Sequence, residues 1–200
     1  VQRAIQVSLP APLSALQDRL QHRFADPLLL VQALTHRSFS TDHNERLEFL
    51  GDSVLNLAVS TLLYRRLQAQ NEGDLSRVRA NLGKEGTLHQ LAKDLRLDQV
   101  LHLGEGEARS GGHQRPSILA DALEAVIGAV YLDAGYAVAE ALVLRLYEAV
   151  EINPQMQAAA KDAKTALQEW LQGRKMQLPQ YRVVGTVGVV GVIGGVIGLC

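Results

Sequence analysis

Five carboxylates stand at helical spacing in two apolar stretches of the chain. Glu45, Glu48 and Asp52 occupy positions i, i+3 and i+7 of NERLEFLGDSVL, and on a helix these positions share one face. Asp121 and Glu124 repeat the i, i+3 spacing within LADALEAVIGAV. A buried carboxylate is costly unless something offsets its charge. The spacing therefore predicts two acidic helix faces that lie opposite each other.

A divalent cation would offset the repulsion between two such faces. Ligands that are all carboxylate oxygens favour Mg²⁺, or Mn²⁺ as its substitute, over Zn²⁺. Mg²⁺ held by carboxylates, with positions left open for water, is an arrangement that activates water against a phosphodiester. The predicted chemistry is metal-assisted hydrolysis of a phosphodiester.

Two other interpretations of the acids are open. Each acid could be an ordinary helix-face carboxylate paired with Arg37, Arg46 or Arg115; this explains one acid alone better than two patterned pairs. A di-iron site in a helical bundle would need Glu-x-x-His on two helices. Gly51 and Ile127 stand where those histidines would belong, which weakens the second interpretation.

The histidines and serines indicate no separate catalytic site. His36, within ALTHRS, is expected to be a core or capping side chain rather than a catalytic one. The spacing of the other histidines in residues 43–113 is not that of metal ligands. Neither Ser38 nor Ser53 has a His/Asp arrangement that spacing could reveal.

The elements that must position the acids are predicted to be helices. Apolar residues recur at helical spacing over six stretches, about 11–24, 27–34, 45–70, 75–97, 117–132 and 138–150. Asp26–Pro27 is typical of a helix start and Asp133–Gly135 of a helix end. Polar breaks are expected at 72–76 and, as a loop, at 104–116. Strand alternation is absent before residue 152, so we predict an all-α domain.

Two glycines stand close to the acids. Gly51 and Gly128 each lower helix stability by up to ~1 kcal/mol, so a compensating role is expected. One interpretation is a close approach of backbone or ligand, and the other is tight helix packing.

Charge and cysteine content restrict the partners and the compartment. The formal net charge is -1. Residues 1–153 carry 15 Lys and Arg against 19 Asp and Glu, whereas residues 154–200 carry 5 against 2. The C-terminal part is thus better suited to a polyanion and the N-terminal part to cations. The single Cys200 excludes an intrachain disulfide and fits a reducing compartment, and we find no apolar secretory signal.

The C-terminal part differs in character. A polar linker at 153–160 precedes a predicted amphipathic helix at 163–174 and a strand at 181–184, an α+β pattern. Residues 183–200 contain six glycines and no charge. A membrane span is one hypothesis for this tail, but the glycines dilute its hydrophobicity and no basic flank follows. The favoured hypothesis is an atypical tail of a truncated second domain.

Several blocks of the chain resemble those of bacterial ribonuclease III, in the same order. They are ALTHRS at 33–38, NERLEFLGDSVL at 44–55, EGDLSRVRANL at 72–82 and LADALEAVIGAVYLD at 119–133. DAKTALQEWLQGRK at 162–175 is similar to the first helix of that family's double-stranded-RNA-binding domain. The resemblance covers about residues 10–185.

The resemblance implies a domain organisation and an activity. It implies a helical endonuclease domain at 10–152, a linker at 153–160, and a partial double-stranded-RNA-binding domain at 161–200. From about residue 186 the Gly/Val tail departs from the two strands and the helix expected there. The implied activity is Mg²⁺-dependent endonucleolytic hydrolysis of double-stranded RNA, which leaves 5′-phosphate and 3′-hydroxyl ends with short 3′ overhangs.

The resemblance also implies a cellular setting. The expected role is processing of rRNA precursors and mRNA by a cytoplasmic homodimer, with no membrane and no small-molecule organic cofactor. A non-catalytic dimeric double-stranded-RNA-binding protein is the alternative, although such a protein would not need facing carboxylates.

Site residues carry over position by position. The resemblance assigns Asp52 and Glu124 to catalysis, and metal binding to these two together with Glu48 and Asp121. It matches Glu45 and Glu72 to auxiliary acids near the cleavage site or the dimer contact.

The resemblance also matches residues that would contact macromolecules. Phe49 corresponds to an aromatic side chain that inserts into the partner subunit. Four positions of the second domain would face the RNA minor groove, or else form a plain solvated helix face: Thr165, Gln168, Glu169 and Gln172.

Overall fold

The computed structural model describes residues 10–152, 171–174 and 176–177. Contacts divide the chain into two units, Val1–Ile152 and Asn153–Cys200, and each is considered by itself. In the described part of the first unit every regular element is helical, and the β-type pairing there is one bridge between Thr35 and His102. The predicted all-α fold of this region is confirmed. The strand expected at 181–184 and the Gly/Val tail lie outside the described residues.

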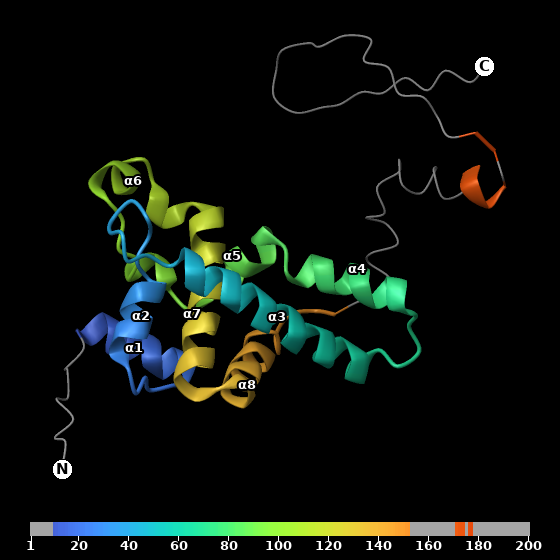
Figure 1. Ribbon diagram of the computed structural model, residues 1–200, viewed down its shortest axis with the longest axis horizontal. Coiled ribbons are helices and arrows are strands. Elements are labelled where there is room, and N and C mark those ends of the chain that lie inside the picture. The colour runs from blue at the N-terminus through green and yellow to red at the C-terminus, as the bar shows by residue number, and fades with distance from the viewer. Residues whose placement is uncertain (1–9, 153–170, 175, 178–200) are drawn as a thin grey trace, which may run out of the picture. The chain divides into compact units, whose positions relative to one another are not determined.

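Within the described residues the helices follow one another through short connections (Figure 1). In chain order they are α1 (Ala11–Leu20), α2 (Pro27–Ala33), α3 (Glu45–Arg66), α4 (Glu72–Leu82), α5 (Glu85–Asp94), the 3₁₀ turn η1 (Leu97–Gln99), α6 (Glu105–Arg109), the 3₁₀ turn η2 (Gly112–Gln114), α7 (Pro116–Ala134) and α8 (Tyr136–Leu146). None of them is long and apolar enough to cross a membrane.

Local sequence signals account for several helix ends. The Asp26 side chain accepts a hydrogen bond from the Leu28 N–H at 3.0 Å, and Pro27 opens α2, as predicted. α7 ends at Ala134, where Gly135 takes a φ of 82°, a backbone conformation that favours glycine.

Two expected breaks are wrong. The break expected at 72–76 is instead the first turn of α4, which begins at Glu72. The Asn71 side chain caps this helix, because it accepts a hydrogen bond from the Asp74 N–H at 3.0 Å. The expected loop at 104–116 contains α6 and η2. An ion pair between Glu105 and Arg109, one turn apart, supports α6.

α3 and α7 cross in direct backbone contact at the centre of the first unit (Figure 1). A Cβ atom added to Gly51 would lie 1.7 Å from the Glu124 carbonyl oxygen, and one added to Gly128 would lie 2.3 Å from the Leu47 carbonyl oxygen. Both distances are far inside van der Waals contact. The structure shows a close approach of one helix backbone to another, which supports both the tight-packing interpretation and the backbone part of the first interpretation.

α7 is the core of this unit. It packs against α2, α3, α5 and α8. From Ile118 to Val130 every residue is buried except Asp121 and Glu124. A helix that is apolar on all sides is expected to be enclosed by its neighbours, so these two carboxylates mark the one place where α7 opens toward polar surroundings along that stretch.

We expect Gly51→Ala to destabilise the folded chain by about 3 kcal/mol, because overpacking at a backbone contact forces the helices apart. Urea unfolding followed by circular dichroism measures this change. Gly86→Ala in α5 is the matched control, because no atom lies within 4 Å of the added Cβ. The control is expected to change stability by less than ~1 kcal/mol, in the stabilising direction. Equal stability of Gly51→Ala and the unchanged protein would contradict the helix contact.

Candidate active site

Four carboxylates surround the contact between α3 and α7. Glu48 and Asp52 lie on α3 on either side of Gly51, the residue that touches the Glu124 backbone. Asp121 lies one turn before Glu124 on α7. We call Glu48, Asp52, Asp121 and Glu124 the acidic cluster. The structure therefore brings together the four acids for which the sequence predicts metal binding.

The members of the acidic cluster lie within electrostatic reach of one another. Burial, and after it the negative charges of Asp52, Glu48 and Asp121, together raise the pKa of Glu124 to about 8. Burial also raises the pKa of Glu48, and the charges of Asp121, Glu45 and Asp52 add to that effect. Folding thus makes the ionised forms of Glu124 and Glu48 less favourable.

Residues outside the acidic cluster also influence the pKa of Asp121. Burial raises its pKa first, and the negative charge of Glu85 on α5 is the next largest influence. His36 and Arg37 act in the opposite direction. The sequence analysis did not identify Glu85, because spacing within one helix carries no information about an acid that approaches from another.

Ordinary ion pairing does not explain the acidic cluster. No Lys, Arg or His side chain of the described residues lies within 4 Å of its carboxylates. Arg37 instead donates to Glu45 at 3.3 Å, and Arg115 pairs with Glu107 at 2.6 Å. The ion-pair interpretation therefore holds for Glu45 but for no member of the cluster.

The donor set fits a hard divalent cation. It consists of four carboxylates whose negative charge is disfavoured by burial and mutual repulsion, and a bound cation would relieve both effects. Among the described residues, no three Asp, Glu, His or Cys side chains already lie in a ligand arrangement. The Asp52 Oδ1 atom accepts a hydrogen bond from Asn56 at 2.7 Å. Asp52 thus has a hydrogen-bond partner on its own helix. Repulsion between like charges disfavours a closer approach of the carboxylates when no cation is bound.

A pocket of about 390 Å³ opens beside the acidic cluster. The connection between α2 and α3 lines it with His36 and Arg37, and the first turns of α3 add Glu45 and Glu48. The start of α7 completes the lining with Asp121 and, just before the helix, Arg115. Carboxylates and basic side chains thus share one polar pocket, which we call the acidic pocket.

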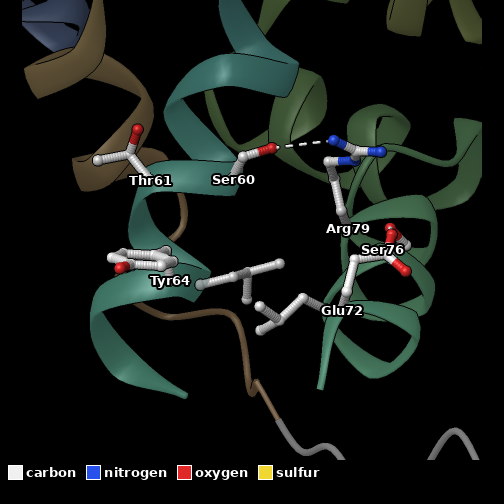
Figure 2. A pocket seen from close by; sticks show the side chains of 8 residues that line it. Ser60, Thr61, Tyr64, Glu72, Ser76 and Arg79 are labelled. Carbon is white, nitrogen blue, oxygen red and sulfur yellow. Dashed lines mark hydrogen bonds between the residues drawn. The ribbon is translucent and has the colours of Figure 1, made fainter. Parts of the chain in front are cut away.

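Other predicted site residues lie elsewhere. Glu72, at the start of α4, lines a different pocket of about 430 Å³ between α3 and α4 and accepts a hydrogen bond from Ser76 at 2.8 Å (Figure 2). Phe49 is 79% exposed. Gln172 is exposed on a helical turn of the second unit. Three further RNA-binding predictions fall outside the described residues: Thr165, Gln168 and Glu169.

We expect Glu124→Gln to stabilise the metal-free protein at alkaline pH. The pKa of Glu124 rises from its ordinary value of 4.5 to about 8 on folding, so the folded state binds this proton more tightly and loses stability as the pH rises between these values. The glutamine variant avoids that loss. We expect a gain of about 2 kcal/mol at pH 8.5, well below the full electrostatic value because water screens part of the group.

Urea unfolding in EDTA at pH 4 and pH 8.5 tests this expectation. At pH 4 the two proteins should differ little, because Glu124 is then protonated in both the folded and the unfolded states. Glu148→Gln, at an exposed carboxylate that follows α8, is the control and should show no pH-dependent gain. A Glu124→Gln protein that is less stable at pH 8.5 than at pH 4, relative to the unchanged chain, would contradict the electrostatic argument.

Comparison with known proteins identifies a family and relatives that this chain resembles in sequence. Residues 26–149 match the family model described as Ribonuclease-III-like. The protein named Ribonuclease 3 from Delftia acidovorans is 72% identical over 178 residues, which are 89% of this chain and 78% of that protein. Ribonuclease 3 from Variovorax paradoxus is 74% identical over 175 residues, which are 88% of this chain and 77% of that protein.

Solved structures agree with these sequence matches. The crystal structure of the nuclease domain of ribonuclease III from Campylobacter jejuni covers 72% of this chain and is itself covered completely, with a TM-score of 0.68 and 41% identity. Another structure of that domain, at 44% identity and a TM-score of 0.67, covers 68% of this chain and 96% of its own length. It is described in terms of structural flexibility in a region involved in dimer formation.

Proposed function

Because this chain belongs to the ribonuclease III family and is an endoribonuclease, we propose that it hydrolyses double-stranded RNA at the acidic cluster in a Mg²⁺-dependent reaction. The observation that carries this proposal is the acidic cluster itself. Its carboxylates lie within electrostatic reach of one another beside a backbone contact and have no basic partner among the described residues. Two of them, Glu48 and Asp121, line a polar pocket.

Each member of the cluster has a proposed role. Glu48, Asp52, Asp121 and Glu124 hold the metal, for which Mn²⁺ is an alternative. When bound, Mg²⁺ supplies positive charge that stabilises the phosphoryl transition state and lowers the pKa of water. Asp52 and Glu124 orient the attacking water and take its proton. Attack on phosphorus with departure of the 3′ oxygen leaves a 5′-phosphate and a 3′-hydroxyl.

We expect Asp52→Asn and Glu124→Gln to lower RNA cleavage at least about a hundredfold, the scale of loss for a general base or metal ligand. The assay follows a long RNA duplex on a denaturing gel, with Mg²⁺ or with EDTA. The exposed Asp18→Asn in α1 is the control and should cut normally. Unimpaired cutting by both variants would contradict the roles of these acids. Binding without cutting by the unchanged protein would instead favour a non-catalytic RNA-binding function.

The proposed enzyme is a homodimer that associates through α3. Three residues with exposed apolar side chains lie along this helix: Phe49 (79% exposed), Leu57 (54%) and Tyr64 (75%). Their spacing keeps them within about 80° of one another around the helix axis. Phe49 and Tyr64 lie at nearly equal distances on either side of Leu57. Two copies packed antiparallel about a twofold axis near Leu57 would thus bring Phe49 of one against Tyr64 of the other.

The pocket between α3 and α4 suits the ring of Phe49 from a second copy. Figure 2 shows Tyr64 and Thr61 on one wall and Glu72, Ser76 and Arg79 on the other, with Arg79 donating to Ser60 at 3.1 Å. Leu63 and Leu75 complete the lining. This arrangement would give Glu72 a place at the dimer contact, which is one of its two expected settings, the other being the cleavage site. The related Campylobacter domain has a region involved in dimer formation, which supports association in this family.

We expect Phe49→Ser to weaken the dimer about tenfold or more, because an exposed aromatic anchor contributes strongly to an interface. Sedimentation velocity over a range of protein concentrations measures the change. Leu28→Ser is the control, because Leu28 is 72% exposed on α2, away from α3. A Phe49→Ser dimer that dissociates at the same concentration as the control would contradict this interface.

The second unit is proposed to add RNA affinity. We propose a nuclease domain at 10–152, a linker at 153–160 and a partial double-stranded-RNA-binding domain at 161–200. Duplex RNA is recognised mainly through its shape and its 2′-hydroxyls, so weak sequence preference is expected. The exposed Gln172 is one proposed contact. A cytoplasmic role in rRNA-precursor and mRNA processing completes the proposal.

A further inference from the structure

His36 is held in one orientation by a residue two positions later. The Ser38 backbone N–H donates to His36 Nδ1 at 3.2 Å, and the Ser38 Oγ atom lies 2.8 Å from the same nitrogen. The Gly104 N–H donates to Ser38 Oγ at 3.0 Å. Two segments that are 66 residues apart in the chain thus fix one imidazole ring.

These contacts decide which ring nitrogen carries the proton. In the neutral ring, Nδ1 accepts the Ser38 N–H and therefore carries the lone pair. Ser38 Oγ accepts from Gly104, so its own hydrogen is available to share that lone pair. In the neutral ring the proton is therefore on Nε2. This nitrogen has no hydrogen-bond partner among the described residues.

The backbone around the ring reinforces this arrangement. The His36 N–H donates to the His102 carbonyl at 3.0 Å, and the His102 N–H donates to the Leu34 carbonyl at 2.9 Å. A Cβ atom added to Gly104 would lie 2.3 Å from the Ser38 carbonyl oxygen. The ring orientation is thus fixed by several contacts that do not depend on the ring itself.

His36 is one of the residues that line the acidic pocket. His36 is half-buried and lines this pocket together with Arg37 and Arg115. Asp121 lies within electrostatic reach of both His36 and Arg37. The lining of the pocket therefore combines carboxylates with donor side chains, among them His36, Arg37 and Arg115. This combination suits a phosphate whose opposite oxygens face a metal and hydrogen-bond donors.

We propose that His36 donates a hydrogen bond from Nε2 to a non-bridging phosphate oxygen of the bound RNA backbone in the acidic pocket. This inference rests on the proposed function and adds to it a substrate-contacting residue that is not a metal ligand. Ser38 and Gly104 are positioning residues for that donor.

Two substitutions separate the donor from the structural role of the ring. In His36→Asn the amide occupies the place of Nδ1 and keeps an acceptor for the Ser38 N–H, but no donor reaches the position of Nε2. In His36→Gln the amide nitrogen reaches the position of Nε2 and restores a donor to the pocket. Kinetics of cleavage of a short RNA duplex and thermal unfolding are measured for both variants and for the unchanged protein.

We expect His36→Asn to lower kcat/KM about tenfold, the loss for one hydrogen bond to a charged oxygen, with its melting temperature unchanged. His36→Gln should recover most of the activity. Equal activity of His36→Asn and the unchanged enzyme would overturn this inference while leaving the proposed function intact. Absence of cutting by the unchanged protein would overturn the proposed function and, with it, this inference.

A binding experiment distinguishes the RNA phosphate from Asp121 as the acceptor. Fluorescence anisotropy with a labelled RNA duplex compares Glu124→Gln with the double variant Glu124→Gln, His36→Asn, neither of which is expected to cut. Weaker binding by the double variant supports a contact to the phosphate. Equal binding, combined with a higher Mg²⁺ requirement for cleavage by His36→Asn alone, would assign the donor to Asp121 and overturn the proposal.

Discussion

The rest of this structure depends on the backbone contact between α3 and α7. Two glycines, Gly51 and Gly128, allow the helices to approach until the Glu124 and Leu47 carbonyls occupy the space where a Cβ would lie. Glycine lowers the helix propensity at these two positions. The close packing of the two apolar helices offsets this loss. It encloses most of α7 and leaves Asp121 and Glu124 as the half-buried residues of its otherwise buried central stretch.

The same contact creates an electrostatic conflict. It brings two acidic pairs toward each other in a half-buried place, where burial and the charges of the other acids together raise the pKa of Glu124 to about 8. Natural proteins retain such unfavourable charge mainly where function requires it. Glu45 differs from the cluster because Arg37 pairs with it at 3.3 Å. A bound divalent cation would relieve the repulsion between the carboxylates of the cluster.

Around this centre, residues from distant parts of the chain act on the side chains that line the acidic pocket. The 102–104 segment holds His36 through Ser38, and α5 brings the charge of Glu85 to Asp121. Glu72 shows the opposite behaviour: it lies at the pocket between α3 and α4 rather than with the other acids of its own chain. A second copy packed along α3 would give Glu72 a different neighbourhood from the one that a single chain provides.

The sequence by itself determined the main helices, including the two that carry the acids, and the faces on which the acids lie. Apolar periodicity identified α3 and α7, the i, i+3 spacing paired the carboxylates, and Asp26 and Gly135 marked helix ends, because each of these signals acts within a few residues of the chain. Only the tertiary structure decided that Gly51 and Gly128 meet backbone, that Glu85 approaches Asp121, and that His36 lines one pocket with Arg115. These relations join residues tens of positions apart. They depend on where one helix crosses another, and spacing within a single helix contains no information about that crossing.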